Sequence, residues 1–301
     1  MKNLLLGALY LSLAASIWGG LFVTVRIAVT VIPPVQLVWL RYVTAILTLY
    51  ILGRGMGVSW HIRREHWRLV FLVGLVGQTI SIVTQETGTM LTSAQTGSIV
   101  TASTPAFMVI FARLLLHEQF TLGRVLSVLL ATIGVLCIVA DPDNVQITGF
   151  WGGLSLVIAA LTWALMSVLL KLLPDYSPVV ITFYGVLVAV VLLAPYALWW
   201  LVQVDWTPMY APEIWGSVLY MGIISTSVGF CLWNKGLLLM DASVGGLFLF
   251  FQPIVGTFFG WLLLGEPITL WFWLGSALVA AGVVLAMRGG KKPAQAPALK
   301  T

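Results

Sequence analysis

Two ionisable residues, Arg41 and Glu86, lie within long apolar stretches of the sequence. If these stretches cross a membrane, charges there are costly and are functional candidates by default. The guanidinium of Arg41 can hold a carboxylate through two parallel hydrogen bonds, and Glu86 can bind an amine or carry a coupled proton. The alternatives are structural: Arg41 reaching the interface along its apolar stem, and Glu86 lying in a hydrated loop.

Two prolines, Pro105 and Pro253, interrupt two other apolar stretches near their middles. Proline has no N–H and breaks the helical hydrogen bond to the residue four positions earlier. Irregular backbone at membrane depth is tolerated only against protein or beside a water-lined cavity. We therefore expect a substrate cavity at these two points, with a simple packing kink as the alternative.

The residue types near these prolines predict a cavity with a polar wall and an aromatic wall. Polar side chains crowd residues 78–104, and aromatic ones crowd residues 230–251. Hydrogen bonds between helices and aromatic core packing are the alternatives. Trp18 and Trp163 lie deep in their stretches, where they line the cavity, stack on a cation or pack in the core. The candidate substrate-binding residues are Trp18, Arg41, Gln78, Gln85, Glu86, Ser98, Thr101, Pro105, Trp163, Tyr184, Trp233, Asn234, Phe248, Gln252 and Pro253.

The remaining chemistry-bearing residues favour structural roles. Lys235 and Asp241 are expected in a solvated turn, and Glu118 and Glu266 at helix ends or in loop pairs. The three histidines, His61, His66 and His117, lie in or beside expected loops, without a serine or metal-ligand partner at membrane depth. The two cysteines, Cys137 and Cys231, are expected to be small buried hydrophobes. The sequence contains no G-x-x-x-x-G-K-[ST] motif. We expect no enzyme activity, metal, cofactor or nucleic-acid partner, and no selectivity filter of a channel is visible.

The composition places the chain in a membrane. Of its 301 residues, 60% are hydrophobic and 8% are charged, against roughly 25% charged in soluble domains. Ten apolar stretches are each long enough to cross a bilayer as a helix. They are residues 4–27, 34–53, 67–86, 91–115, 122–140, 149–172, 178–202, 212–234, 241–264 and 269–287. A disordered basic tail, residues 289–301, is expected to follow them.

Lys and Arg predict the orientation of these helices. With the N-terminus in the cytoplasm, all of the 15 Lys and Arg residues except Arg26 and Arg41 fall on the cytoplasmic side. The positive-inside rule therefore predicts that both termini are cytoplasmic.

The sequence repeats itself. A shift of 148 residues places Glu65–Ala140 on Glu213–Arg288 without a gap, so that Pro105 falls on Pro253 and Glu118 on Glu266. A shift of 145 places Trp18 on Trp163. Because a unit of five helices is odd, the second copy must enter the membrane from the opposite side. The expected fold is thus an all-α polytopic membrane protein of ten transmembrane helices, built from two inverted units at residues 1–145 and 146–288, as in secondary transporters.

These motifs carry a resemblance to a known family. The residues that resemble the EamA-domain branch of the drug/metabolite transporter superfamily are Trp18-Gly19, Arg41-Tyr42, Ala94, Pro105, Leu116-x-Glu118, Ala242, Pro253 and Leu264-x-Glu266. Arg41 has no basic counterpart, because Tyr184-Gly185 occupies the matching stretch. The resemblance implies a ten-helix carrier of the bacterial inner membrane that exports amino acids or other small metabolites.

We therefore expect a secondary transporter of an amino acid or a related amphipathic solute, embedded in the lipid bilayer and driven by the solute gradient or a coupled proton. Sodium coupling stays open, as does the oligomeric state. The alternatives are a transporter of hydrophobic drugs or cations, one of nucleoside- or sugar-like metabolites, and a membrane scaffold that transports nothing.

Overall fold

The structure is a computed structural model that describes residues 2–92, 97, 100–101, 103–119, 121–139, 150–264 and 270–289. Within these residues every regular element is a helix and none is a strand. Six helices are long and apolar enough to cross a membrane: Asn3–Ala28, Pro34–Gly55, Arg64–Leu91, Phe150–Leu170, Pro178–Gln203 and Pro212–Leu238. Shorter apolar helices occupy Thr104–Leu116, Leu122–Gly134, Ala242–Gly256 and Trp273–Leu285. The expectation of an all-α, multi-pass membrane protein is confirmed at this level.

The two halves of the chain have a corresponding order of elements. The first half contains α1 (Lys2–Ala28), α2 (Pro34–Gly55), η1 (Arg64–His66), α3 (Trp67–Val73), η2 (Gly74–Ser81), α4 (Ile82–Leu91), α6 (Thr104–Leu116) and α7 (Leu122–Val139). The second half contains α8 (Phe150–Leu170), α9 (Pro178–Gln203), η3 (Thr207–Tyr210), α10 (Pro212–Leu219), η4 (Tyr220–Gly229), α11 (Phe230–Leu238), α12 (Ala242–Gly246), η5 (Leu247–Phe250), α13 (Phe251–Leu264) and α14 (Leu270–Gly289). The two orders differ in that the second half has α12 and η5 before α13, whereas the described part of the first half has no such elements before α6. The basic tail that was expected after residue 288 lies outside the described residues beyond Gly289.

The third span of each half contains a π-helical segment. These segments, η2 and η4, fall on each other under the shift of 148 residues. In each, one hydroxyl donates to the carbonyl five residues earlier: Thr79 Oγ1 to Gly74 O at 3.1 Å, and Ser227 Oγ to Gly222 O at 2.9 Å. π-helical turns often mark functional sites. The apolar pattern of the sequence predicts regular helices in both places.

The third span also runs further than expected. It ends at Leu91 rather than at residue 86, so Glu86 lies inside α4 and is fully buried. The interpretation of Glu86 as a hydrated loop residue at the helix end is therefore wrong. The apolar run extends through Met90 and Leu91, which can face lipid without a break in the helix.

Pro105 lies at the start of a helix and not in a helix middle, which corrects the prediction for this residue, whereas Pro253 lies within the helical run Ala242–Gly256, just after its 3-10 segment. Pro105 is the second residue of α6, and Pro253 is the third residue of α13. A turn at Ser103 precedes α6, and the 3-10 segment η5 precedes α13. Proline is tolerated there because the first N–H groups of a helix have no intrahelical partner to lose. Each proline therefore marks the point where an interrupted span resumes as an α-helix.

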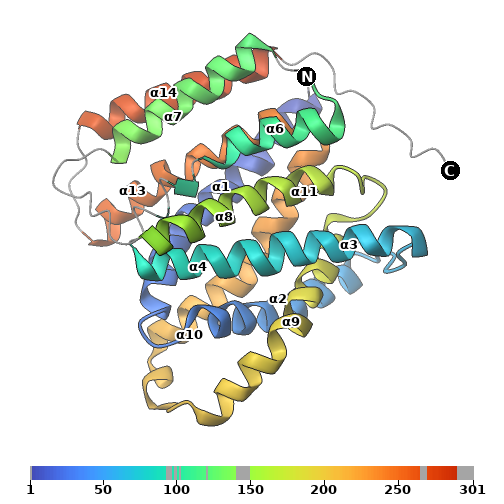
Figure 1. Cartoon of the computed structure of the whole chain (residues 1–301), viewed down its shortest axis with the longest axis vertical. Helices are drawn as coiled ribbons and strands as arrows, with labels where there is room; N and C mark the ends of the chain where they lie inside the picture. Colours follow the sequence, from blue (N-terminus) through green and yellow to red (C-terminus); the bar gives the residue numbers. More distant parts are fainter. Residues whose placement is uncertain are drawn as a thin grey trace.

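The packing of the two halves is reciprocal (Figure 1). Helix α1 packs against α11 and α13, and its counterpart α8 packs against α4 and α6. Helix α2 packs against η4, whereas α9 packs against η2. Two helix pairs join equivalent elements: α2 with α9, and α7 with α14, which lie side by side at one edge of the molecule.

Matching glycines permit two of these close approaches. A Cβ atom on Gly88 would lie 2.6 Å from Leu156 Cγ and 2.9 Å from Gly152 O. A Cβ atom on Gly236 would lie 2.6 Å from Leu11 Cγ and 3.2 Å from Gly7 O. The shifts of 148 and 145 residues superpose these two sets. Close helix approach at small residues is how membrane helices gain packing energy without a hydrophobic effect between them.

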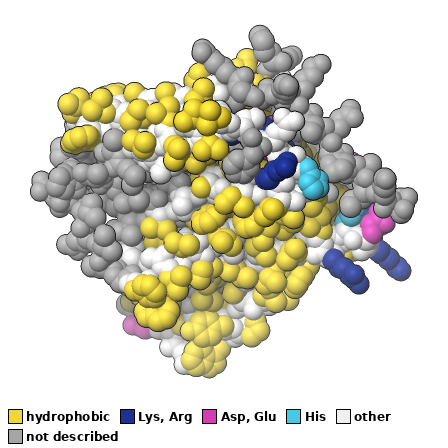
Figure 2. Space-filling view, turned by 45° about the horizontal axis from the view of Figure 1, so that its top comes forward, with side chains coloured by type: hydrophobic (Ala, Val, Ile, Leu, Met, Phe, Trp, Pro, Cys, Tyr) yellow, Lys and Arg dark blue, Asp and Glu magenta, His cyan; other side chains and the backbone are white. Residues whose placement is uncertain are grey.

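The surface agrees with a bilayer environment. Large apolar side chains such as Leu47, Ile51 and Val191 are more than 60% exposed. In the view of Figure 2, hydrophobic side chains cover most of the described surface, while Lys, Arg and His side chains gather toward one edge. A water-exposed surface of this composition would be unusual, whereas lipid tails accept it.

Candidate functional site

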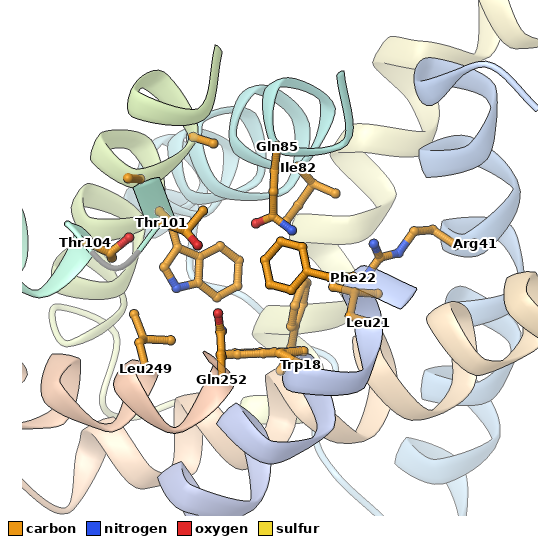
Figure 3. Close-up of a pocket in the computed structure, with 14 residues that line it drawn as sticks. Trp18, Leu21, Phe22, Arg41, Ile82, Gln85, Thr101, Thr104, Leu249 and Gln252 are labelled. Carbon is orange, nitrogen blue, oxygen red and sulfur yellow. The ribbon is translucent and has the colours of Figure 1, made fainter. Parts of the chain in front are cut away.

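A cavity lies inside the helix bundle, with walls from both halves of the chain (Figure 3). Figure 3 shows Gln85 and Gln252 on opposite sides of it, with Thr101 and Thr104 at one end and Arg41 at the other. Its volume is about 30 Å³, and one water needs about 10–15 Å³ on this measure. This conformation therefore has room for a few waters, and a larger solute requires the walls to move apart. The lining residues are Trp18, Leu21, Phe22, Arg41, Ile82, Gln85, Thr101, Thr104, Ala159, Ala160, Trp163, Phe230, Leu249 and Gln252.

Arg41 joins the cavity to a buried polar network. Its Nη1 lies 2.7 Å from Glu86 Oε1, and both side chains are 0% exposed. Its Nε and Nη2 donate to Thr226 Oγ1 at 3.1 and 2.9 Å, and Nη2 lies 3.5 Å from Ser225 Oγ. The pairing that the sequence allowed between Arg41 and Glu86 is therefore present. A paired and hydrogen-bonded guanidinium can remain charged in an apolar interior.

Only one of the two carboxyl oxygens of Glu86 has a hydrogen-bond partner among the described residues. Its Oε1 accepts from Arg41, but its Oε2 is buried and has no hydrogen-bond partner among the described residues. A buried, unsatisfied polar atom in a native structure calls for an explanation such as a proton, a water or a ligand. The carboxyl is thus placed to accept a proton or a donor group next to the Arg41 guanidinium.

Aromatic rings form the other part of the wall. The Trp18 and Trp163 rings meet edge to face with centroids 5.2 Å apart, and Phe230 lies 5.6 Å from Trp18 and 5.2 Å from Trp163. The edges and faces of such rings suit a flat or apolar group. Each half contributes polar and aromatic residues alike, so the expected division into a polar first-half wall and an aromatic second-half wall is wrong.

Six of the predicted binding residues line the cavity: Trp18, Arg41, Gln85, Thr101, Trp163 and Gln252. Others support it from behind. Glu86 and Gln78 are buried, and the Gln78 side-chain and backbone oxygens accept from the Tyr42 hydroxyl at 3.1 and 3.0 Å. Trp233 is buried against Trp18, and its Nε1 donates to Ser167 Oγ at 3.1 Å.

The remaining predicted residues lie elsewhere or in the packed interior. Phe248 is buried and stacks on Phe251, and Pro105 and Pro253 are buried near the starts of α6 and α13. Tyr184 donates to Trp60 O at 2.9 Å, beside the loop that follows α2. Asn234 donates to Thr182 Oγ1 at 2.9 Å, beside a second, smaller cavity. Ser98 lies outside the described residues.

Ser225 and Thr226 were missed by the sequence analysis, although they bond to Arg41 or to Trp18. Both belong to η4, and the π-helical turn is not visible in the hydrophobic pattern. A signal was nevertheless present, because the shift of 148 residues places Thr226 on Gln78, which was already a candidate. Comparing candidate residues across the repeat would have identified Thr226.

A second charged cluster joins the α6–α7 loop to the α11–α12 turn and the end of α8. Arg124 pairs with Glu118 at 3.3 Å and also with Asp241, and Lys171 Nζ donates to Met240 O. Glu118 also caps α12, accepting from Ala242 N at 2.9 Å and from Ser243 Oγ at 2.5 Å. This agrees with the loop-pairing role expected for Glu118, while Glu266 lies outside the described residues.

The charged cluster is partly withdrawn from solvent, which corrects the expectation of a solvated turn at Asp241. The Asp241 side chain is 14% exposed. Burial, and to a smaller extent the nearby Glu118 carboxylate, raises the pKa of the Asp241 carboxyl. The positive charges of Arg124 and Lys171 lower this pKa but do not cancel the effect of burial. Burial also lowers the pKa of the Lys171 ammonium, although the nearby carboxylates of Glu118 and Asp241 raise it. Lys235 is exposed, with its Nζ 5.0 Å from the centre of the Tyr10 ring.

No group of three or more His, Cys, Asp or Glu side chains that could hold a metal ion occurs in the described part of the chain. The chemistry that the cavity offers is therefore that of its hydrogen-bond donors, its buried ion pair and its aromatic rings.

Comparison with known proteins identifies the family of this fold. The profile of the EamA-like transporter family matches residues 5–140 and again residues 150–288. An uncharacterized transporter of Archaeoglobus fulgidus is 26% identical over 92% of this chain and 97% of its own length. A riboflavin transporter of Brucella anthropi is 29% identical over 86% of this chain and 89% of its own length. One solved crystal structure has a TM-score of 0.78 at 18% identity, covering 93% of this chain and 96% of the other, which shows a shared fold. The chain belongs to the EamA-like transporter family.

Proposed function

We propose that this protein is a secondary carrier that moves a small metabolite across the bacterial cytoplasmic membrane by alternating access. Its ten helices form two inverted units, residues 1–145 and 146–288. Two separate family matches, the reciprocal helix packing and the paired π-helical segments support this arrangement. Two near-equivalent halves around one cavity allow the cavity to open to either side in turn.

The proposed orientation places both termini in the cytoplasm. Glu118, Arg124, Lys171 and Asp241 are far apart in the sequence and meet in one cluster. The predicted topology assigns all four to the cytoplasmic side. Their meeting supports the placement of all four on one side, because charged loop residues on opposite sides of a bilayer could not contact one another, and the positive-inside rule makes that side the cytoplasm.

The proposed solute is an amino acid or a related amphipathic molecule. The observation that carries this proposal is the Arg41 guanidinium in the wall of a cavity that also contains the Trp18, Trp163 and Phe230 rings. A guanidinium favours a carboxylate, and the rings favour an apolar side chain. The proposal of export rests on the family resemblance alone.

A second candidate solute is a planar heterocycle. One relative is named a riboflavin transporter, and the Trp18, Trp163 and Phe230 rings in the cavity wall offer aromatic surface on which a flat molecule can stack. In this case the Gln85 and Gln252 amides would bind the edge of the heterocycle.

The proposed source of energy is a solute gradient or a coupled proton, since the sequence holds no ATP-binding loop. The unpartnered Oε2 of Glu86 supports a proton site beside Arg41. Proton binding there would weaken the ion pair and change what Arg41 can hold.

Counterflow in proteoliposomes tests the proposal. Vesicles preloaded with an unlabelled mixture of amino acids and riboflavin receive each labelled compound outside, and the Pro105→Leu/Pro253→Leu variant is the control. Transient accumulation of a label by the wild type alone is the expected result. If no amino acid accumulates, amino acids are excluded as solutes. A wider panel of hydrophobic cations, sugars and nucleosides then decides between another carrier and a scaffold.

A further inference from the structure

The two matching tryptophans of the cavity differ in one hydrogen bond. Trp18 Nε1 donates to Ser225 O in the π-helical segment η4 at 3.0 Å. Trp163 Nε1 is equally buried but has no acceptor among the described residues. Trp163 is 8% exposed, and its ring lines the cavity. An indole N–H can only donate, so it has no other way to be satisfied.

The repeat shows what the missing acceptor would be. The shift of 148 residues places Ser225 on Gly77, in the other π-helical segment, η2. If the halves were fully symmetric, Trp163 would donate to Gly77 O as Trp18 donates to Ser225 O. Met166 packs so closely on Gly77 that a Cβ atom there would lie 2.0 Å from Met166 Cγ. Trp163 thus occupies the position that matches Trp18 in the repeat, but its Nε1 does not form the matching hydrogen bond to a backbone carbonyl.

An unsatisfied donor in a native interior is rare and is explained by an ordered water or a ligand. The cavity has room for only a few waters in this conformation, and Nε1 itself is buried, so a solute oxygen would reach it as the walls move apart to admit the solute. Arg41 can only donate, whereas the Gln85 and Gln252 amides and the Thr101 and Thr104 hydroxyls can both donate and accept. These groups can bind the acceptor oxygens of a solute together with Trp163 Nε1.

We propose that Trp163 Nε1 is a specificity-determining donor that binds an sp² oxygen of the transported solute, whereas Trp18 serves the structure. This inference rests on the proposed carrier function and deepens it. The oxygen belongs to the carboxylate of an amino acid or to the ring carbonyl of a planar heterocycle. In both cases a solute without such an oxygen leaves the donor unsatisfied and is rejected.

The test compares Trp163→Phe with Trp18→Phe, because both variants keep an aromatic ring and remove one N–H. The probes are the labelled L-amino acids, the amines that lack their carboxylate, and riboflavin. Counterflow gives KM, and thermal unfolding in detergent gives the stability without and with each probe. A charge-assisted hydrogen bond lost from the bound state corresponds to an increase of about tenfold in KM, or about 1.4 kcal/mol.

The expected result is a reciprocal pattern. Trp163→Phe raises KM for the acceptor-bearing probe about tenfold and narrows the preference for the amino acid over its amine. It lowers the unfolding temperature of the probe-free protein less than Trp18→Phe does, because it removes ring contacts but no hydrogen bond. Trp18→Phe lowers that temperature, because it removes the bond to Ser225 O. Whether the affected probe is an amino acid or riboflavin tells which oxygen is bound.

Three results would overturn the inference. If wild type and Trp163→Phe move a probe with equal KM, the donor role fails and the carrier function stands. If the wild-type protein neither transports any probe nor is stabilised by one, the proposed solutes are wrong. The proposed contact between Trp163 Nε1 and a solute oxygen is then wrong as well. A Trp163→Phe protein destabilised as much as Trp18→Phe, with KM unchanged, would assign Trp163 to the structure.

Discussion

At the scale of single residues, the Arg41–Glu86 pair places two opposite charges in the interior of the protein. Both side chains are fully buried, and Thr226 and Ser225 supply further bonds to the guanidinium. Removing one charge from a buried pair leaves the other uncompensated, whereas replacing both by apolar residues is often close to neutral. Stability and transport can therefore be separated at this pair.

We predict that Arg41→Leu and Glu86→Leu each destabilise the protein by about 3–5 kcal/mol, whereas the double variant unfolds close to the wild type. Thermal unfolding in detergent measures this. The exposed pair Arg63–Glu65, with atoms 3.9 Å apart and side chains 61% and 67% exposed, provides the matched control. Arg63→Leu should change the unfolding temperature little.

The double variant also tests the function of the pair. If it folds and still performs counterflow, Arg41 and Glu86 are structural and the proposed carboxylate and proton sites fail. If it folds but transports nothing, the pair acts on the solute or on a coupled proton.

At the scale of elements, the π-helical segment η4 supplies bonding partners to two residues of the cavity wall, Arg41 and Trp18. In η4 the wider turn presents Thr226 and Ser225 O to residues of α2 and α1. Ser227 holds this turn, since its hydroxyl donates to Gly222 O at 2.9 Å and lies 3.3 Å from Ala45 O in α2.

We predict that Ser227→Ala lowers stability by about 1 kcal/mol, the usual net value of a buried hydrogen bond, and slows counterflow. Ser217→Ala is the matched control. Ser217 is also buried in this span, but its hydroxyl donates only to Glu213 O of the preceding turn, at 2.7 Å. Equal effects of the two substitutions on transport would show that the π-helical turn has no particular role.

The loop cluster around Asp241 predicts a pH effect. Because burial raises the pKa of Asp241 above 3.8 in the folded protein, the folded state holds this proton more tightly than the unfolded chain. The associated stability is present below pH 3.8 and is lost as the pH rises through the folded-state pKa.

We therefore predict that wild type loses stability relative to Asp241→Asn as the pH rises from 3.8 toward neutrality. Unfolding temperatures of both proteins, measured across this range in one detergent, give the difference. A difference that stays constant or changes in the other direction would contradict the prediction. Asp205, which is fully exposed, supplies the control substitution Asp205→Asn.

At the scale of the whole molecule, the proposed inverted arrangement of the two halves requires a definite topology. The loop around Ser59 and the loop around Asp205 should lie on opposite sides of the membrane, with Ser59 in the cytoplasm. Both residues are exposed. In a Cys137→Ala/Cys231→Ala background, we predict that a membrane-impermeant maleimide labels Asp205→Cys in intact cells. Ser59→Cys should react only after permeabilisation, and the reverse pattern would invert the proposed orientation.

The sequence by itself determined the class of the protein, the approximate position of the apolar helices and the repeat. These properties can be recognised in the sequence without knowing the tertiary structure. A long run of apolar residues predicts a membrane-spanning helix whichever helices it packs against. The match of Glu65-x-Trp67 to Glu213-x-Trp215 depends only on the residue types and their spacing. Arg41 and Glu86 stood out for the same reason, because a charge within an apolar run is visible in one dimension.

Only the tertiary structure decided which of these residues meet. Tyr184 and Asn234 seemed equivalent to Gln85 and Gln252 in sequence, yet they bond to Trp60 O and Thr182 away from the cavity. The hydroxyl partners of Arg41, Thr226 and Ser225, come from η4, more than 180 residues further along the chain. Whether a tryptophan N–H finds a carbonyl depends on how closely two helices approach and on a π-helical turn between them. Helix packing sets that distance, and no hydrophobic pattern encodes it.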